Sequence, residues 1–249
     1  MNNLPYGQMG FKLIGNLFFA LILMTGCIHH SSKNETSSES EQIDAPEQVS
    51  SEVEKEWNLE FSEDFSDVAT GAEPESIFIL DGEYKVQKEG GDNKCLLLPG
   101  TPMGDFGLLF GNREREKALE LSFSFYASKK GRRMPSVAAS IGGVRGYKLR
   151  LNPAARNIVL SMDETVFKTM PFSWHGDKWW NIRFQALPGN LSQTSRLQFK
   201  LWPKEQNEPN KWYLSEDFEI EYRGGKCALW GFPYSSTPIL FDDIVILSM

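Results

Sequence analysis

The sequence is poor in the residues from which most metal centres are built. Its 249 residues include only three histidines and three cysteines, too few for the usual zinc ligand clusters. The formal net charge is -7 and no segment is dense in lysine or arginine, so the chain lacks the positive surface that nucleic acid binding requires. Zinc enzymes and nucleic-acid-binding proteins are therefore excluded, and we expect no cofactor.

Residues 1–26 have the features of a bacterial signal peptide. A run of 12 apolar residues at 13–24 follows Lys12, which suits a signal-peptide core and is too short for a membrane-spanning helix. The run ends in LMTGC at residues 23–27, which resembles the bacterial lipobox, with methionine in place of the commoner leucine. This resemblance implies that Cys27 is lipidated and becomes the new N-terminus. The alternative is an ordinary secretory signal followed by a coincidental cysteine.

The residue after Cys27 bears on the location of the protein. Ile28, rather than aspartate, follows the cysteine, which resembles the sorting pattern for the outer membrane. Several acyl chains on one residue give stable anchoring, whereas a single chain gives only marginal binding. We therefore expect a lipoprotein of the bacterial cell envelope, anchored in the outer membrane and facing either the periplasm or the exterior.

Residues 27–56 are predicted to form a disordered, acidic linker. The segment is rich in serine and glutamate and nearly free of aromatic residues, so it cannot bury enough apolar surface to offset the entropy of ordering. It holds eight acidic and two basic residues, which leaves 25 acidic and 23 basic residues in 57–249. The domain that follows is therefore nearly neutral, and self-repulsion is expected to extend the linker and hold that domain off the membrane.

Residues 57–249 show the alternation that is typical of β-strands. In residues 119–126, leucine or phenylalanine occupies every second position. Runs of this kind are separated by glycine, proline and asparagine, with no long helical periodicity. They lie at residues 82–87, 94–99, 118–128, 136–141, 146–152, 157–162, 179–187, 196–202, 218–223, 226–232 and 239–247. This pattern predicts one all-β domain, a two-sheet antiparallel jelly-roll sandwich, in which the last run is a central strand because it is apolar on both faces.

One hairpin can be aligned from its side-chain pattern. The predicted strands around Ile182 and Phe199 each have an apolar face made of alternate residues. An antiparallel register that joins these faces places Ile182 opposite Phe199, and it places Trp179 opposite Trp202 on the other face. Registers shifted by two residues also preserve the faces, and they leave the two tryptophans diagonal to one another.

Four segments carry a resemblance to a known group of domains. They are FSEDFSD at 61–67, the GEY-V strand at 82–86, KLWPKEQNEPNKWYL at 200–214 and FDDIVI at 241–246. These segments resemble the laminin G-like, concanavalin A-like sandwich modules of bacterial surface and periplasmic proteins. The related keto-disaccharide hydrolase-like domains, which are similar to family 16 glycoside hydrolases, share that fold. The resemblance covers most of 57–249 and implies contact with carbohydrate, usually as a module.

A glycosidase needs two suitably spaced carboxylates, and the sequence offers no good pair. The family 16 signature E-x-D-x-x-E is absent from the domain. Glu219 and Glu221 share one face of a predicted strand, but such alternation is typical of a solvated outer face. His175, the single histidine of the domain, lies in a predicted loop and is interpreted as a surface residue. Glycoside hydrolysis is therefore the alternative function, and we expect no catalytic residues.

The sequence offers more suitable residues for a carbohydrate-binding surface than for a glycosidase active site. Sugar rings stack their apolar faces on aromatic side chains, while planar polar groups bind the hydroxyls. The residues that we expect to contact a ligand are Trp179, Trp202, Arg183, Gln185 and Arg150 on strands, and Trp174 and Tyr234 in loops. Alternatively, Trp202 packs under the loop 203–212 and Trp179 is covered by a neighbouring segment. Trp180 and Trp230 are assigned to the core or its vicinity.

A structural calcium ion is the one metal that the sequence allows. The hard oxygen ligands where the first strand meets the last would come from Asp64 or Asp67 and from Asp242 or Asp243. The alternative is that one aspartate of the closing pair bonds to backbone N–H groups.

Cys95 and Cys227 are the cysteines of the domain, and both begin predicted strands. In an oxidising compartment they either form a disulfide or remain as small, buried hydrophobic residues.

Together these features predict a membrane-anchored lipoprotein whose domain is a non-catalytic, lectin-like carbohydrate-binding or interaction module. The expected partners are a glycan or polysaccharide, the membrane through the lipid anchor and, as a further possibility, another envelope protein. A keto-disaccharide hydrolase-like enzyme and a structural envelope protein are the alternatives.

Overall fold

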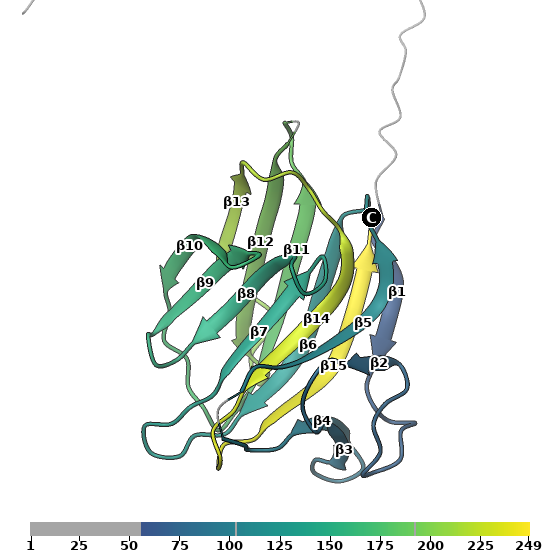
Figure 1. Ribbon diagram of the computed structural model, residues 1–249, viewed down its shortest axis with the longest axis vertical. Coiled ribbons are helices and arrows are strands. Elements are labelled where there is room, and N and C mark those ends of the chain that lie inside the picture. The colour runs from purple at the N-terminus through teal and green to yellow at the C-terminus, as the bar shows by residue number, and fades with distance from the viewer. Residues whose placement is uncertain (1–55, 103, 192) are drawn as a thin grey trace, which may run out of the picture. The chain divides into compact units, whose positions relative to one another are not determined.

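The computed structural model describes residues 56–102, 104–191 and 193–249. The predicted signal peptide, Cys27 and all of the predicted linker except Glu56 lie outside the described residues. The described part forms two antiparallel sheets, as the alternation predicts, with 15 strands in place of the eleven predicted runs. It contains no helix that could span a membrane. Figure 1 shows one sheet lying over the other.

Sheet A has eight strands in the order β13-β12-β11-β6-β15-β4-β3, with β1 also paired to β15. Its strands are β1 (Asn58–Glu63), β3 (Lys85–Lys88), β4 (Lys94–Leu98), β6 (Leu119–Ala127), β11 (Trp179–Pro188), β12 (Ser195–Pro203), β13 (Leu214–Phe218) and β15 (Ile239–Ser248).

Sheet B has seven strands in the order β10-β9-β8-β7-β14-β5-β2. Its strands are β2 (Ile77–Ile79), β5 (Phe106–Glu114), β7 (Ser136–Ile141), β8 (Tyr147–Asn152), β9 (Asn157–Met162), β10 (Thr165–Pro171) and β14 (Gly225–Phe232).

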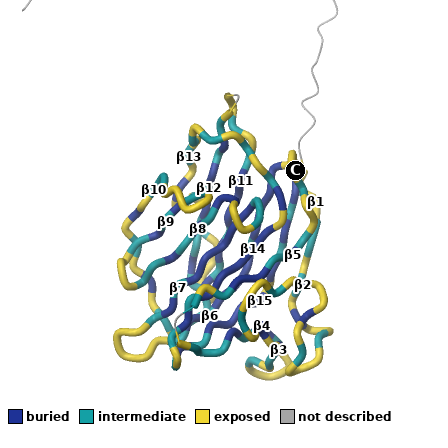
Figure 2. The backbone as a smooth tube through the Cα atoms, in the orientation of Figure 1, coloured by how far each residue is buried: buried dark blue, intermediate teal, exposed yellow. Residues whose placement is uncertain are grey.

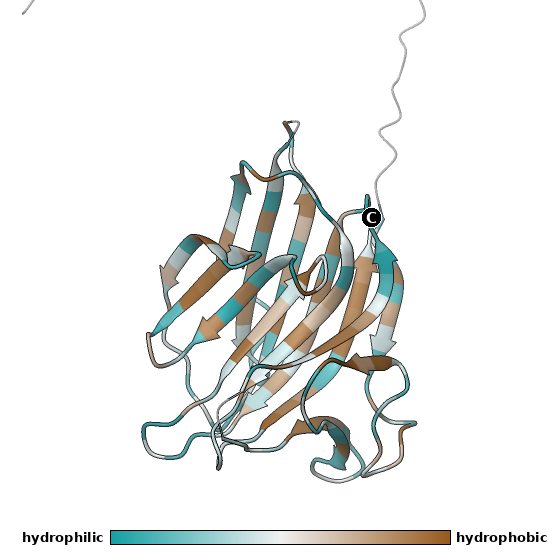
Figure 3. Cartoon of the chain, in the orientation of Figure 1, coloured by the Kyte–Doolittle hydropathy of each residue, from teal (hydrophilic) through white to brown (hydrophobic). Residues whose placement is uncertain are grey.

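The core lies between the two sheets because successive side chains of a strand point to opposite faces. Every second residue of β6 and β8 is buried in it, including Phe125 and Leu149. Figure 2 shows the buried residues along the strands and the exposed residues in the connecting loops, and Figure 3 shows the matching alternation of hydropathy. The described core residues all lie between Phe61 and Ile246, so the domain carries its own core and we expect residues 56–249 to fold without the preceding segment.

The hairpin of β11 and β12 has its predicted faces but not its preferred register. Ile182 pairs with Leu201, and Phe184 pairs with Phe199, two residues away from the preferred alignment. Trp202 therefore lies opposite Asn181 and diagonal to Trp179, as in one of the alternative registers. The side-chain period of two fixes the face but does not separate registers that differ by two residues.

The last strand occupies the central place that its sequence predicts. β15 pairs with β6 along one edge, and with β4 and then β1 along the other. The register against β6 shifts between Asp242 and Val245, and Asp243 adopts a φ of 51° within this bulge. Aspartate tolerates this left-handed conformation better than most residues do.

One predicted strand was wrong. The run 218–223 was expected to form a strand, but only Phe218 belongs to one, as the last residue of β13. Glu219 and Glu221 are exposed and lie beyond its end, so they do not share a strand face. The alternation in this run therefore does not reflect pairing in a sheet.

Candidate functional site

The outer face of sheet A contains four of the predicted ligand-binding residues: Trp179, Trp202, Arg183 and Gln185. The last two are the polar ones. Both bind the carboxylate of Glu120, which is only 2% exposed. Arg183 also holds Glu208 through two hydrogen bonds, of 2.8 and 2.9 Å. These donors therefore satisfy a buried carboxylate and a loop, and they are not free to bind sugar hydroxyls.

The loop 204–212 lies over this face and is fastened through Glu208. Lys200 forms an ion pair with Glu208 at 2.6 Å and donates to the Pro209 carbonyl at 3.1 Å. The ammonium of Lys200 also lies 4.8 Å from the centre of the Trp212 ring. Trp202, on the same face of β12, is only 9% exposed, which agrees with the alternative in which it packs under this loop.

Trp179 is the predicted residue that keeps a partly open ring on sheet A. Its ring lies 5.9 Å from that of Tyr126, and the Lys204 ammonium lies 5.2 Å from its centre. This pair of rings stands apart from Arg150, which belongs to the other sheet, so the predicted residues do not form one surface.

Trp174 was predicted to contact a ligand from a loop, but its side chain is buried. Trp174 is 5% exposed and stacks edge-on against Phe125 and Trp180, because the segment after β10 folds into the end of the core. Tyr234 is half-buried, and its backbone N–H is bonded to the Thr237 hydroxyl at 2.9 Å within a turn. Neither residue joins the other candidates.

The outer face of sheet B combines aromatic rings with cations. The Lys148 ammonium lies 4.1 Å from the centre of the Trp230 ring, and the Arg150 guanidinium lies 3.8 Å from the centre of the Phe232 ring. Both cations are on β8 and both rings are on β14, with β7 between them. Long side chains can cross β7 because its outward residues are small, and Ala138 is one of them. Trp230 is 6% exposed, so its ring is largely covered in this arrangement.

The two cations of this face form no ion pair with a described carboxylate, although the charge of Asp105 favours the charged form of both. Among the described residues, neither Lys148 nor Arg150 forms an ion pair, and the buried Nε of Arg150 has no hydrogen-bond partner. Burial lowers the pKa of Lys148, and the neighbouring charge of Arg150 lowers it further. Burial likewise lowers the pKa of Arg150. The partly buried setting therefore disfavours both positive charges, and a ligand that brings oxygen acceptors to this face would stabilise them.

Sequence reasoning identified Arg150 but missed Lys148 and Phe232. The alternation in 146–152 places Lys148 and Arg150 on one face, so their proximity could have been inferred. Phe232 lies on β14, two strands away from β8 and across the small residues of β7. This arrangement depends on the order of strands in the sheet, which no local sequence pattern encodes.

Three of the four aspartates proposed for calcium are engaged by donors of the protein itself. Asp242 accepts the Asp243 N–H at 2.8 Å, and Asp243 accepts the Ser124 hydroxyl and forms an ion pair with Lys204 at 2.6 Å. The Asp64 carboxylate accepts the N–H of the residue two positions on. No group of three or more histidine, cysteine, aspartate or glutamate side chains in the described chain is placed to hold a metal. The Asp242 contact agrees with the alternative in which one aspartate of the closing pair bonds to a backbone N–H group.

The two cysteines of the domain are free and fully buried. Cys95 lies in sheet A on β4, whereas Cys227 lies in sheet B and faces the core. Of the two alternatives, the disulfide is therefore the one that is not formed. Burial raises the pKa of the Cys95 thiol to about 12 and raises that of Cys227 as well. They behave as the small hydrophobic residues of the alternative interpretation.

The fold belongs to the class of concanavalin A-like, legume-lectin-like sandwiches. Over 77% of this chain and 98% of the other, it is similar to the carbohydrate recognition domain of Emp46p in its metal-free form, with a TM-score of 0.54 and 10% identity. It is also similar to the Ca2+/Man3GlcNAc-bound exoplasmic/lumenal domain of VIP36, over 78% and 91% of the chains, with a TM-score of 0.52 and 9% identity.

Arcelin-5, a lectin-like defence protein from Phaseolus vulgaris, matches over 77% of this chain and 99% of its own, with a TM-score of 0.52 and 9% identity. No protein-family model and no curated protein sequence matches the chain. At these identities the likeness establishes the fold, and the function must be argued from the surface.

Proposed function

We propose that the domain is a lectin-like carbohydrate-binding module and that its ligand lies on the outer face of sheet B, over Trp230 and Phe232. The observation that carries this proposal is the pair of cations, Lys148 and Arg150, that stack on aromatic rings and form no ion pair among the described residues. The similarity of the fold to the carbohydrate recognition domain of Emp46p and to the Man3GlcNAc-bound domain of VIP36 supports the proposal.

The chemistry of this face suits a sugar. The half-buried Phe232 ring offers apolar surface to the C–H face of a pyranose, and the guanidinium of Arg150 beside it offers several fixed donors for hydroxyl oxygens. The buried Nε of Arg150 has no hydrogen-bond partner within the described structure, so the surroundings of this guanidinium do not satisfy all of its donors.

The outer face of sheet A is less suited to the same task. Arg183 and Lys200 are neutralised by Glu208, and the loop 204–212 lies over the strand that carries Trp202. The open Trp179 ring there remains the competing location for a ligand.

The finer proposal is that the chain is a lipoprotein of the bacterial cell envelope, anchored through Cys27 in the outer membrane. The apolar run and the lipobox-like residues 23–27 support it. The acidic linker would then hold the binding face clear of the membrane surface.

A glycan array with residues 56–249 tests the binding face. We expect the double variant Lys148→Gln/Arg150→Gln, and separately Phe232→Ala, to weaken binding of the best glycan at least tenfold. The matched controls on sheet A, Arg196→Gln and Trp179→Ala, should change it by less than twofold, and melting temperatures should confirm that each variant is folded.

Loss of binding in Trp179→Ala with no loss in the sheet B variants would place the site on sheet A and refute the assignment to sheet B. Silence of the wild type across the array would refute the carbohydrate-binding function itself. A shortened ligand would instead indicate the keto-disaccharide hydrolase-like alternative.

A further inference from the structure

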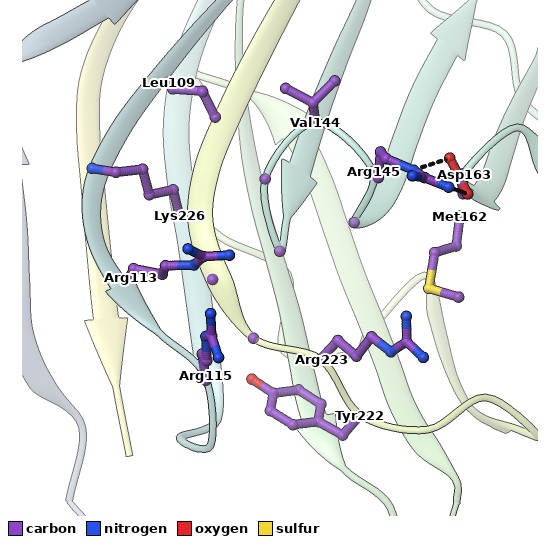
Figure 4. A pocket seen from close by; sticks show the side chains of 15 residues that line it. Leu109, Arg113, Arg115, Val144, Arg145, Met162, Asp163, Tyr222, Arg223 and Lys226 are labelled. Carbon is purple, nitrogen blue, oxygen red and sulfur yellow. Dashed lines mark hydrogen bonds and ion pairs between the residues drawn. The ribbon is translucent and has the colours of Figure 1, made fainter.

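A basic pocket opens where the end of sheet B meets the segment 222–226. It has a volume of about 790 Å³ and is lined by the end of β5, the β7–β8 turn, the β9–β10 turn and the start of β14. In the view of Figure 4, Arg113, Arg115 and Lys226 lie on one side, and Arg145 with Asp163 lies on the other.

The pocket gathers much more positive than negative charge. Five of its lining residues are cations: Arg113, Arg115, Arg145, Arg223 and Lys226. Its one carboxylate, Asp163, is engaged by Arg145, with a hydrogen bond of 2.6 Å between Nε and Oδ1. Because the whole domain is nearly neutral, this concentration of charge is a local feature and not a consequence of composition.

Four cations remain to be accounted for after the pairing with Asp163. Lys226 donates to the Gly111 carbonyl at 2.6 Å. The guanidinium of Arg223 lies 3.6 Å from the carboxylate of Glu221, and the side chains of these two residues are each about 70% exposed. An exposed pair of that length contributes little. Arg113 and Arg115 form no ion pair within the described ranges, so their guanidinium groups are available to a ligand.

Glycines let the pocket walls come close together. Gly142 has a φ of 99°, and a Cβ at Gly146 would lie 2.1 Å from the Ile141 carbonyl oxygen. The β7–β8 turn, which forms one wall of the pocket, therefore requires glycine to fold tightly.

The pocket is continuous with the aromatic face of sheet B. Lys226, which lines the pocket, is on the same outward side of β14 as Ala228 and Trp230. Four residues along a strand correspond to about 13 Å, so one extended ligand can reach both Trp230 and the pocket. A molecule that presents sugar rings to the face and anionic groups to the pocket satisfies both surfaces.

We propose that this pocket binds the carboxylate or sulfate groups of an acidic glycan whose sugar rings lie on the outer face of sheet B. The forked donors of Arg113 and Arg115 match the paired oxygens of such groups, which hydroxyls alone cannot match. This inference rests on the proposed carbohydrate-binding function and adds the class of ligand.

Two pairs of polymers that differ in charge test it by titration calorimetry with residues 56–249. Polygalacturonate is compared with its methyl ester, and dextran sulfate with dextran. We expect the acidic polymer of at least one pair to bind at least tenfold more tightly than its neutral counterpart, with an affinity that falls as salt is raised. Arg113→Gln/Arg115→Gln should remove most of this preference.

The matched control is Arg132→Gln/Arg133→Gln, which removes the same charge from exposed arginines in the β6–β7 connection. It should change the affinity by less than twofold, and both variants should melt at the wild-type temperature. Equal loss in the two double variants would mean non-specific attraction and would overturn the proposal. The proposal would also be overturned if the wild type bound neither acidic polymer more tightly than its neutral counterpart. Tighter binding to vesicles of anionic lipid than to the acidic polymers would overturn it as well.

The two proposals fail in different ways. If neutral glycans bind and only Phe232→Ala weakens them, carbohydrate binding stands and the acidic-ligand inference is wrong. If acidic polymers bind through Arg113 and Arg115 while Phe232→Ala and Lys148→Gln/Arg150→Gln have no effect, the pocket is an anion site and the aromatic face is not its partner, which overturns the inference as stated.

Discussion

Arg183 and Arg150 both lie on an outer face of the sandwich, and their partners give them different roles. Arg183 is paired with Glu120 and Glu208, so its charge is used in holding the structure together. Arg150 stacks on Phe232 and keeps a donor without a partner. Strand alternation predicts that both face outward, but only the cross-strand and loop contacts separate a structural arginine from a free one.

The neighbours Trp179 and Trp180 provide a residue-scale prediction. Trp180 is 6% exposed, lies edge-on to Trp174 and donates to the His175 carbonyl at 2.9 Å. Trp180→Ala should therefore lower the free energy of unfolding by about 3–5 kcal/mol, through the cavity and the lost contacts. Trp179→Ala, on the half-buried outer side, should cost about 1 kcal/mol. Urea denaturation of the two variants measures both values.

Similar losses for the two variants would contradict the assignment of faces. If Trp180→Ala does not fold, Trp180→Phe replaces it in the comparison. Phenylalanine keeps part of the aromatic ring, so this variant should remain folded, with a free energy of unfolding between those of the wild type and the alanine variant.

At the scale of the elements, alternation predicts which side of a strand is buried and leaves the partner undetermined. The strands 136–141 and 157–162 have the predicted bounds, and β15 is central as expected. The β11–β12 register differs by two residues from the preferred one because both registers join the same apolar faces. The five strands β1, β2, β5, β10 and β13 were not predicted; β2 is short, and β5 and β10 are each irregular in pairing.

The loop 204–212 provides an element-scale prediction with a pH dependence. Burial raises the pKa of Glu208, but the hydrogen bonds and charges of Arg183 and Lys200 outweigh that effect and hold the pKa below its ordinary value of 4.5. A carboxylate whose pKa is lower in the folded than in the unfolded state stabilises the fold, and the effect is complete at pH values above the unfolded-state pKa. The stabilisation is lost as the pH falls through the folded-state pKa. Glu208→Gln should therefore cost about 1 kcal/mol at pH 7.

The difference between the wild type and Glu208→Gln should shrink as the pH falls below about 4.5, where the wild-type carboxyl becomes protonated. Chemical denaturation across this pH range measures it, and Glu219→Gln, at an exposed position, is the matched control. A difference that stays constant with pH would show that Glu208 acts through packing and not through its charge.

For the whole molecule, the sequence is enough to predict a two-sheet sandwich, because the alternation and the turn residues act locally. The site is less accessible to such reasoning. It depends on β8 and β14 lying two strands apart in one sheet, and on residues from β5, the β7–β8 turn and residues 222–226 meeting at one end. These are long-range consequences of strand order, and Arg113 and Arg115 carry no local mark that separates them from solvated arginines.

The remaining whole-molecule prediction concerns Cys27 and attachment to the membrane. If this residue is lipidated, the full chain expressed in a Gram-negative bacterium should incorporate labelled palmitate and sediment with the outer membrane. Cys27→Ser should be unlabelled and soluble, because no other residue would supply the acyl chains on which stable anchoring depends. Cys95→Ala is the control that should keep the label, since this thiol is buried in the domain. An unlabelled, soluble wild type would instead support the ordinary secretory signal, and the binding domain would then act without a tether.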